Sequence, residues 1–428
     1  MVRIEEQKQA TQNLPIENLP LPAVAYLSLS QHLGKIAVAE VAVGDLVSTG
    51  QRIAKPQAHV SSPIHASLSG KVISIGDWPH PLLGRCNSIV IESDGLDNPQ
   101  VAGYRAEAEV EKLTPEEIRN IVFEAGIVGM GGAGFPAQIK LNPPKAVDTL
   151  IINGAECEPF LTGDYRLMLE KSEEILQGIE IIARCLGVKR IIIAIEDNKP
   201  QAINKFESSV RRTPYMVRVL KSSYPQGGEK QLIKNVLGKE VPRGKLPFEV
   251  GVVVHNVATV YAIYEAVYFS KPLYERVVTV TGSCLTHPKN IRVRLGTPIK
   301  FLIDFCGPLK QDPAKLLIGG PMMGLAQYTD QVPVIKTTTG IVLLSEEEAK
   351  IREEEFCIRC GACVRECPVG LMPCLINLAC EKELWTEAKA YGALDCVECG
   401  LCNYVCPAKR TLTQSIKRVK LEAARGIL

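Results

Sequence analysis

Short apolar runs alternate with a predicted helix in the middle of the chain. Residues 149–153 and 190–196 have the length and the apolar character of buried strands. A helix is predicted between them, roughly over residues 172–186. Strands that alternate with helices indicate an α/β domain with a substantially parallel sheet.

A capping signal predicts where another helix of this domain begins. Thr114 is followed by Pro115 and then by Glu117. These residues match an N-cap, a proline at the first helical position and a capping box. We expect this helix to end near Gly126, just before a glycine-rich loop.

The polar and apolar pattern becomes β-rich on both sides of this domain. Residues 22–91 contain short β-type runs, and the Gly44-Asp45 and Ser69-Gly70 pairs predict hairpin turns. This part resembles the barrel-sandwich fold of lipoyl and biotinyl carrier domains. Residues 55–68 lack the Met-Lys-Met-type turn of those carriers, so we expect a docking or structural module. A second β-rich stretch runs from residue 277 to about 307.

Composition limits the classes of protein. The chain has 428 residues, 46% of them hydrophobic, which suits three or four packed domains. A net charge of +2 and an aromatic content of 5% argue against nucleic-acid binding. The longest apolar stretch, residues 250–269, is interrupted by polar residues, so no membrane-spanning segment is expected. The basic stretch 408–428 predicts a solvated helix or one that docks on an acidic partner or an anionic membrane surface.

Ten of the fifteen cysteines lie between Cys357 and Cys406, and eight of them form a repeated pattern. Each copy reads C-x2-C-x2-C-x3-C-P, the run that holds [4Fe–4S] clusters in two-cluster bacterial ferredoxins. Three cysteines of a copy hold one cluster and the fourth reaches the other. We therefore predict one cluster on Cys357, Cys360, Cys363 and Cys406, and a second on Cys396, Cys399, Cys402 and Cys367. Gly361 and Gly400 lie inside the loops, where a positive φ is expected.

Other uses of these cysteines fit less well. Zinc knuckles do not explain a third and a fourth cysteine followed by proline in both copies. Disulfides are not expected, because the chain has the character of an intracellular protein. The remaining cysteines are expected to be small buried or structural residues: Cys374 and Cys380 between the copies, and Cys86, Cys157, Cys185, Cys284 and Cys306 elsewhere.

Four glycines lie within six residues: Gly129, Gly131, Gly132 and Gly134. Such a loop lets backbone N–H groups approach a phosphate or a flat ring. The motif is neither a dinucleotide-binding fingerprint after a strand nor a Walker loop. On its own, a generic tight turn fits it as well.

The order of several motifs along the chain favours a ligand-binding loop over a generic tight turn. The glycine loop and Lys140 are followed by the segments 153–159, 224–230 and 255–259. Together with segments 30–34, 62–67 and 318–324 and both cysteine runs, they resemble the C subunit of the Rnf electron-transport complex. That family is related to the flavin-binding subunit of respiratory complex I. The resemblance covers nearly the whole chain.

The resemblance implies a multidomain α/β and α+β protein. We expect an extended N-terminal arm (1–21), a barrel-sandwich β module (22–105), an FMN- and NAD(H)-binding α/β domain of the complex I type (106–270) and an SLBB-like β-rich domain (271–344). A charged linker (345–356) then leads to a helical, ferredoxin-like domain with two [4Fe–4S] clusters and a basic tail (357–428).

The resemblance also implies roles for individual residues. Those implied for catalysis are Glu158 at the nicotinamide ribose or amide, Glu229 along the flavin, and Phe135 stacked near the nicotinamide. Those implied to bind FMN are Gly129, Gly131, Gly132, Gly134, Lys140, Asn153, Glu156, Tyr224, Gly227, Gly228, Asn256 and Thr259, with the glycines and Lys140 at the phosphate. Without the resemblance, Glu156 and Glu158 would be read as exposed loop acids.

The chain departs from the family patterns at three places. Ala155 stands where the complex I subunit has an aspartate, and Gly228 where it has a glutamate, which bears on the nicotinamide geometry. Residues 1–21 lack the Gly-Gly-x-His-Pro segment of Rnf C subunits.

The implied function is that of a peripheral subunit of a membrane-bound ferredoxin:NAD oxidoreductase on the cytoplasmic face of the bacterial cell membrane. It would pass electrons between NAD(H), FMN and two clusters. An iron–sulfur subunit and ion-pumping membrane subunits would be its partners. Two alternatives stay open. One is a cobalamin-reductase-like flavoprotein of the propanediol-utilisation type, in which the barrel-sandwich module follows the cluster domain. The other is an electron conduit with a vacant flavin site.

Overall fold

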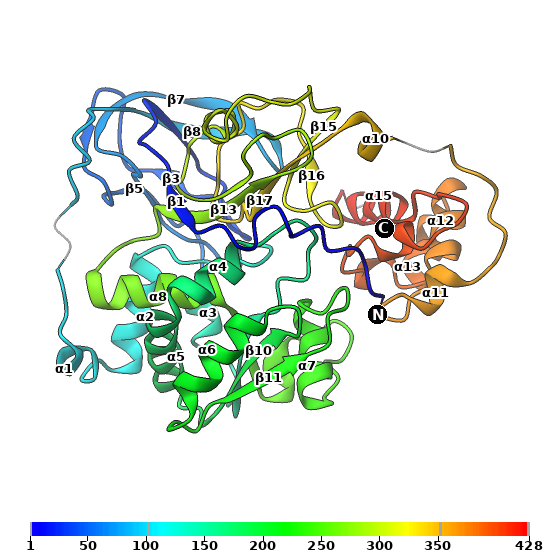
Figure 1. The fold of residues 1–428 in the computed structure, drawn as a ribbon, viewed down its shortest axis with the longest axis horizontal. Helices are drawn as coiled ribbons and strands as arrows, with labels where there is room; N and C mark the ends of the chain where they lie inside the picture. The colour runs from blue at the N-terminus through cyan, green and yellow to red at the C-terminus, as the bar shows by residue number, and fades with distance from the viewer. Residues whose placement is uncertain (1, 101–102, 351–352, 426–428) are drawn as a thin grey trace.

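The computed structural model describes residues 2–100, 103–350 and 353–425 of the chain. Four β-sheets and their covering helices form the larger body, and a small helical domain lies beside it (Figure 1). The N-terminus lies next to this helical domain, although almost the whole sequence separates them (Figure 1). Every helix within the described residues is too short or too polar to cross a bilayer.

The central domain is built on a four-stranded sheet in which all neighbouring strands are parallel, as predicted. The strand order is β11-β10-β9-β12. Their bounds are β9 (Thr149–Gly154), β10 (Arg190–Glu196), β11 (Met216–Leu220) and β12 (Val252–Asn256). The strands expected at 149–153 and 190–196 are confirmed, and they are buried along almost their whole length.

The helices of this domain begin and end where their caps predict. Helix α2 (Pro115–Glu124) has Thr114 as its N-cap, and the Glu117 carboxylate accepts the Thr114 N–H at 2.7 Å, so the capping box is confirmed. Helix α5 spans Ser172–Leu186, as predicted, and Gly187 ends it at φ 69°. The other helices are α1 (Glu107–Val110), α3 (Ala137–Lys140), α4 (Gly163–Glu170), α6 (Pro200–Val210), α7 (Glu229–Leu237), the 3₁₀ helix η1 (Pro247–Val250) and α8 (Val257–Phe269).

The N-terminal module is a sandwich of two small sheets. One has the order β2-β8-β7-β4, the other β3-β5-β6. Their bounds are β2 (Val24–Ser28), β3 (Val38–Ala39), β4 (Leu46–Val47), β5 (Arg52–Lys55), β6 (Ile64–His65), β7 (Gly70–His80) and β8 (Gly84–Ser93). The hairpins predicted at Gly44-Asp45 and Ser69-Gly70 are wrong. The strands on either side of each turn belong to different sheets, so the chain crosses the sandwich at both places.

A six-stranded mixed sheet corresponds to the second β-rich stretch. Its order is β1-β14-β13-β17-β15-β16. The bounds are β1 (Ile16–Asn18), β13 (Glu275–Thr281), β14 (Lys289–Arg294), β15 (Lys315–Ile318), β16 (Leu325–Ala326) and β17 (Gly340–Leu344), with helix α9 (Ile299–Phe305) between them. The expected arm therefore ends in a strand, because β1 pairs with β14 in parallel.

The C-terminal domain is all helical in its described part. Its helices are α11 (Ala362–Arg365), α12 (Pro373–Glu381), α13 (Trp385–Ala390), the 3₁₀ helix η2 (Ala393–Asp395), α14 (Leu401–Tyr404) and α15 (Leu412–Ala424). The expected linker contains one short helix, α10 (Glu346–Ala349), capped by Ser345. Residues 351–352 of that linker, residues 426–428 of the basic tail and residue 1 of the arm lie outside the described residues.

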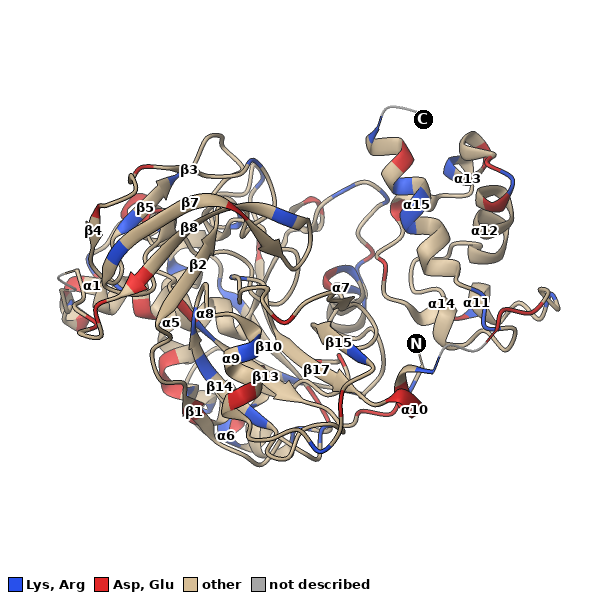
Figure 2. Ribbon diagram, turned by 90° about the horizontal axis from the view of Figure 1, so that it is seen from above, with Lys and Arg blue, Asp and Glu red and all other residues tan. Residues whose placement is uncertain are grey.

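The basic tail is an amphipathic helix whose charges are largely paired within the domain. Helix α15 buries Leu412, Ile416 and Val419. Arg418 pairs with Glu383 at 2.9 Å and Lys420 with Glu398 at 2.7 Å. Basic and acidic segments accordingly lie next to each other on α13 and α15 (Figure 2). This internal pairing leaves the helix less positive charge for an acidic surface than its sequence indicated.

Candidate flavin and iron–sulfur sites

The parallel sheet places two predicted flavin residues side by side. The chain runs from β9 to β10 and β11 on one side and returns to β12 on the other, so the connections change direction between β9 and β12. Ligands of such sheets bind outside the carboxyl ends of the strands at this point. Asn153 and Asn256 stand there and are direct partners in the β9–β12 register.

The glycine loop lies against these strand ends. A bridge between Val128 and Pro136 closes it at the base. The Met130 N–H donates to the Thr259 hydroxyl at 2.9 Å. A Cβ on Gly131 would lie 2.8 Å from the Asn256 amide nitrogen, so this position requires glycine. The structure thus brings the loop together with Asn256 and Thr259, the residues expected to close the phosphate side.

The tip of the loop fits a phosphate. The N–H groups of Gly131, Gly132 and Ala133 donate no hydrogen bond to any other described residue, and all three residues are exposed. A Cβ on Gly132 would meet nothing within 4 Å. Exposed N–H groups on a glycine-rich turn are the donors that an FMN phosphate needs.

Other predicted residues gather around the same strand ends. Lys140 donates to the Glu229 carboxylate at 2.6 Å and to the Val254 carbonyl at 3.1 Å. The Asn153 amide donates to the Gly227 carbonyl at 2.9 Å. Both charged side chains of the Lys140–Glu229 pair are about one third exposed, so a ligand can reach them. Gly228 is the N-cap of α7.

Glu156 uses its carboxylate at the start of α4. It has φ 46°, and its two carboxylate oxygens accept the N–H groups of Asp164 at 2.7 Å and Tyr165 at 3.1 Å. It therefore stabilises the start of α4, where anions are favoured. Its expected place at the flavin stays a prediction, because both oxygens are already engaged.

Two charged residues in this region, Asp164 (half-buried) and Arg276 (buried), had no signal in the sequence. Asp164 accepts from the Asn256 amide at 2.5 Å, and burial and the nearby Glu156 charge raise its pKa. Arg276 of β13 donates to the Met130 carbonyl at 3.4 Å, and burial lowers its pKa to about 10. The SLBB-like sheet thus contacts the glycine loop through Arg276.

Glu158 connects the flavin domain to a loop of the SLBB-like sheet. Its carboxylate accepts the N–H groups of Met322 at 2.7 Å and Met323 at 3.1 Å, and burial raises its pKa. Lys8 of the arm donates to the backbone carbonyls of Glu156, Glu158 and Leu161 at 2.6 to 3.0 Å. Glu158 is therefore half-buried and bonded to backbone N–H groups rather than an exposed acid, and its role at the nicotinamide stays a prediction.

Phe135 and Cys157 complete the set of predicted residues. Phe135 is half-buried at the end of the glycine loop, and its carbonyl accepts the Gly129 N–H. Cys157 accepts the Gly227 N–H at 3.3 Å, and burial raises its pKa to about 12. A thiol this weakly acidic is a poor nucleophile, which agrees with a packing role.

Tyr224 lies at the cluster domain rather than along an open flavin site. Its hydroxyl donates to the Cys399 carbonyl at 2.8 Å and lies 3.5 Å from the Glu158 carboxylate. The side chain is almost fully buried. The segment that contains Tyr224 and Gly227 therefore touches both the strand ends and the cysteine loops.

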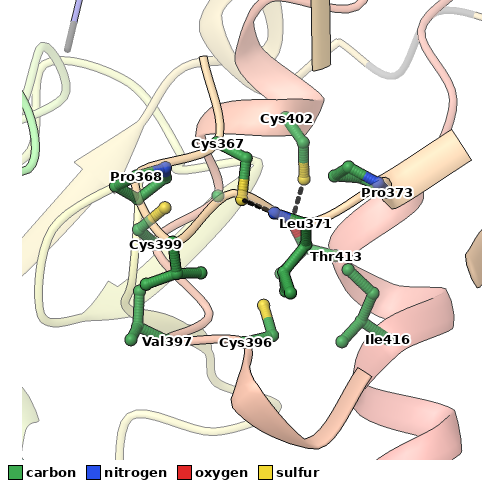
Figure 3. A pocket seen from close by; sticks show the side chains of 12 residues that line it. Cys367, Pro368, Leu371, Pro373, Cys396, Val397, Cys399, Cys402, Thr413 and Ile416 are labelled. Carbon is green, nitrogen blue, oxygen red and sulfur yellow. Dashed lines mark hydrogen bonds between the residues drawn. The ribbon is translucent and has the colours of Figure 1, made fainter. Parts of the chain in front are cut away.

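Four cysteines surround one cavity in the C-terminal domain. They are Cys367, Cys396, Cys399 and Cys402, the set predicted for the second cluster (Figure 3). The Leu371 N–H donates to the Cys367 sulfur at 3.3 Å (Figure 3). Hydrogen bonds of this kind tune cluster potentials. Cys367 is the fourth cysteine of the first run, yet it lies beside three cysteines of the second run. This is the exchange of fourth cysteines that the motif implies.

The other predicted set lies partly at the surface. Cys363 and Cys406 pack together with Cys374, whereas Cys357 and Cys360 are exposed. Within the described residues, no group of three or more His, Cys, Asp or Glu side chains has the geometry of a metal site. Gly361 and Gly400 have φ 72° and 75°, as expected for tight loops around clusters. Cys380 is buried and Cys374 half-buried.

Three cysteines of the second set have raised pKa values. Burial raises the pKa of Cys396 and Cys402, and that of Cys399 to about 12. Cluster assembly must therefore release these protons, because only thiolates bind iron. The donor set, the cavity and the loop conformations fit an iron–sulfur cluster.

Family models match the chain in the order of its motifs. The barrel sandwich hybrid domain of RnfC matches residues 2–96, and the FMN-binding domain of Nuo51 matches residues 122–265. The SLBB domain matches residues 277–326, and a 4Fe-4S binding domain matches residues 351–371. Fold and site together define a flavin-binding iron–sulfur protein of the complex I type.

Curated relatives specify the family. The chain is 47% identical over 424 residues to the C subunit of the proton-translocating ferredoxin:NAD(+) oxidoreductase complex of Clostridium ljungdahlii, with 98% of this chain and 93% of the relative covered. It is 42% identical over 421 residues to the Na(+)-translocating counterpart of Acetobacterium woodii, with 97% and 94% covered. The chain belongs to the family of C subunits of ion-translocating ferredoxin:NAD(+) oxidoreductase complexes, which confirms the resemblance inferred from its motifs.

A solved structure shares the fold at low identity. The crystal structure of NAD+-reducing [NiFe]-hydrogenase in the H2-reduced state superposes with a TM-score of 0.52 at 18% identity, covering 73% of this chain and 62% of that chain. At this identity the likeness supports the fold alone.

Proposed function

We propose that this chain binds FMN at the glycine loop and two [4Fe–4S] clusters at the cysteine runs, and passes electrons between NAD(H) and the clusters. It acts as a peripheral subunit of a ferredoxin:NAD oxidoreductase. Partner subunits, including an iron–sulfur subunit and ion-pumping membrane subunits, couple the electron flow to ion translocation.

One observation carries the proposal: a single loop between β11 and α7 serves both sites. The Gly227 carbonyl accepts from Asn153 at the strand ends. Tyr224, three residues earlier, donates to the Cys399 carbonyl in the loop of the second cluster. A flavin at the strand ends and a cluster in the cysteine cavity are therefore neighbours, as electron transfer between them requires.

The chain's own residues supply binding and placement. When bound, FMN exchanges an electron pair with NAD(H) and single electrons with iron–sulfur clusters. The N–H groups of residues 131–133 bind its phosphate, and Lys140 adds a positive charge there. Asn153 and Asn256 fix its position at the strand ends. Glu229, held by Lys140, and Glu158 are the candidates for contact with the nicotinamide.

Relatives and domain order favour this function over the alternatives. The curated relatives belong to ferredoxin:NAD(+) oxidoreductase complexes. The barrel-sandwich module precedes the cluster domain, whereas it follows that domain in the cobalamin-reductase-like alternative. We place the chain on the cytoplasmic face of the bacterial membrane, because eight proposed cluster cysteines and seven further cysteines without a disulfide suit a reducing compartment.

Substitution at the open glycine tests the flavin site. In Gly132→Val the new side chain meets no protein atom near its Cβ, so the fold should be unchanged, but it occupies the space in front of the free N–H groups. We expect this variant to retain its iron and its melting temperature and to lose bound FMN, measured by flavin fluorescence after acid release. Gly103→Val, at an equally open exposed glycine, is the matched control and should keep FMN.

Iron content and flavin content together decide between the remaining functions. Protein purified without oxygen should contain about eight iron atoms per chain, four for each [4Fe–4S] cluster. NADH should then bleach the bound flavin. A chain with this iron content that binds no FMN on reconstitution would instead be an electron conduit with a vacant flavin site.

A further inference from the structure

The first residues of the chain contact the junction between the flavin domain and the cluster domain. Val2 and Tyr224 form an antiparallel bridge, in which the Tyr224 N–H donates to the Val2 carbonyl at 2.8 Å and the Val2 N–H donates back at 3.3 Å. Figures 1 and 2 both place the N-terminus beside the cluster-bearing helices. The arm thus reaches a junction some 220 residues away in the sequence.

A small apolar cluster joins the same three segments. Ile4, Tyr224, Cys399 and Leu401 are all buried and pack against one another. Ile4 comes from the arm, Tyr224 from the flavin domain, and the other two from the loop and helix of the second cluster. Burial of side chains from three segments favours their association, at roughly 25 cal/mol for each Å² of apolar surface removed from water.

The Tyr224 hydroxyl adds a directional contact. It donates to the Cys399 carbonyl at 2.8 Å, and the neighbouring Met322 carbonyl comes so close to Gly400 that a Cβ there would lie 2.6 Å from it. Two contacts, one from the Tyr224 hydroxyl and one from the Met322 backbone, therefore hold the cysteine loop. The ring of Tyr224 is 1% exposed, which leaves no free face to stack on a flavin.

We propose that residues 2–4 and Tyr224 form a latch that holds the second cluster's loop, residues 396–402, against the flavin domain. Tyr224 is then a positioning residue for electron transfer between the flavin and this cluster. In that step one electron leaves the reduced flavin and reduces the cluster by one unit, and no bond to the protein forms or breaks. The inference rests on the proposed function and assigns the arm and Tyr224 a part in it.

Tyr224→Phe tests the hydroxyl alone, because the ring and its apolar contacts remain. A hydrogen bond of this kind contributes about 0.5–1.5 kcal/mol, so its loss should raise the open fraction of the latch roughly two- to tenfold. Hydrogen exchange of the iron-loaded protein, read by mass spectrometry, should be faster by this factor in peptides that cover residues 222–226 and 396–402. This readout does not depend on activity.

Stopped-flow reduction by NADH supplies the second readout. The ratio of the cluster-reduction rate to the flavin-reduction rate should fall in Tyr224→Phe, because the hydroxyl no longer fixes the Cys399 loop against the flavin domain. Ile4→Ser, which removes the arm's apolar contact, should lower the same ratio and leave flavin reduction unchanged. Tyr328→Phe is the matched control, because this hydroxyl also donates to a backbone carbonyl at 2.8 Å but lies on the exposed side of the molecule.

Three outcomes overturn the latch. Unchanged hydrogen exchange in both Tyr224→Phe and Ile4→Ser would show that the contacts hold nothing. An unchanged rate ratio would show that the loop needs no positioning. Flavin reduction slowed as much as cluster reduction would place Tyr224 at the nicotinamide instead. Failure of the unaltered protein to bind FMN would refute the proposed function, while hydrogen exchange would still decide the latch.

Discussion

At the scale of single residues, Lys336 is a buried charge that joins two domains. Its ammonium group is fully buried and donates to the carbonyls of Gly126 at 2.6 Å and Pro63 at 2.8 Å. Burial lowers its pKa to about 7. His32 and His65 face it, and burial together with the Lys336 charge lowers their pKa values to about 4 and 3. One amino group thus connects the N-terminal module to the segment that leads into the glycine loop.

The lowered pKa of Lys336 predicts a dependence of stability on pH. Between about pH 7 and pH 10.5 the unfolded chain binds a proton on this lysine that the folded chain does not, so stability rises with pH across this window. The slope approaches about 1.4 kcal/mol per pH unit. We expect the melting temperature of Lys336→Met to rise less, or to fall more, from pH 7 to pH 9.5 than that of the unaltered protein.

An exposed lysine provides the comparison for this prediction. Lys71 is exposed on β7, and Lys71→Met should keep the pH dependence of the unaltered protein. If Lys336→Met and Lys71→Met show the same change of melting temperature with pH, the ammonium of Lys336 does not titrate in this window. The histidines do not interfere, because their pKa values lie well below it.

At the scale of elements, α15 holds the loop of the second cluster. Lys420 donates to the Cys396 carbonyl at 2.6 Å and to the Glu398 carboxylate at 2.7 Å. Charge-assisted hydrogen bonds of this kind are worth about 1.5–3 kcal/mol, so their loss should loosen the loop. We expect Lys420→Met to lose iron to a chelator several-fold faster than the unaltered protein. Lys389→Met, at an exposed lysine of α13, should lose it at the unaltered rate.

Elements with local signals could be predicted from the sequence, and those that depend on distant partners could not. The ends of α2 and α5 follow from a capping box and from a glycine with positive φ. The turns at Gly44 and Gly70 carry equally clear signals, but a turn does not specify which strand comes next in the sheet. For the same reason the arm gave no sign of β1, whose partner β14 lies some 270 residues away.

The residues of the candidate site likewise fall into those that the sequence predicted and those that it did not. Glycine loops and cysteine runs have fixed spacings, because one ligand imposes them, and the structure brings together the glycine loop with Asn256 and Thr259, and four of the eight cysteines around one cavity. Lys8, Asp164 and Arg276 were missed, because each is a charged residue whose partners lie in another segment or domain. The residues beside them in the sequence form no recognisable motif. Only the fold shows that these three residues hold the loops around the strand ends.

At the scale of the whole molecule, the contacts indicate which of the two predicted clusters lies nearer to the flavin domain. The loop of the second cluster touches that domain through Tyr224 and Cys399. The first set lies farther along the chain's surface, where Cys357 and Cys360 are exposed next to the exposed side chains of Phe356 and Ile358. An electron from the flavin should therefore enter the second cluster first, and a partner should meet the first cluster.

Cysteine substitutions in the two sets should then have different effects. In Cys360→Ser, NADH should bleach the flavin and reduce the remaining second cluster at the unaltered rate. In Cys399→Ser, NADH should bleach the flavin but leave the remaining first cluster oxidised on the same timescale, because its neighbour in the path is missing. Stopped-flow absorbance with iron analysis of each variant measures this difference. Equal cluster reduction in both variants would mean that the flavin reaches the two clusters independently, and the order inferred from the Tyr224–Cys399 contact would be wrong.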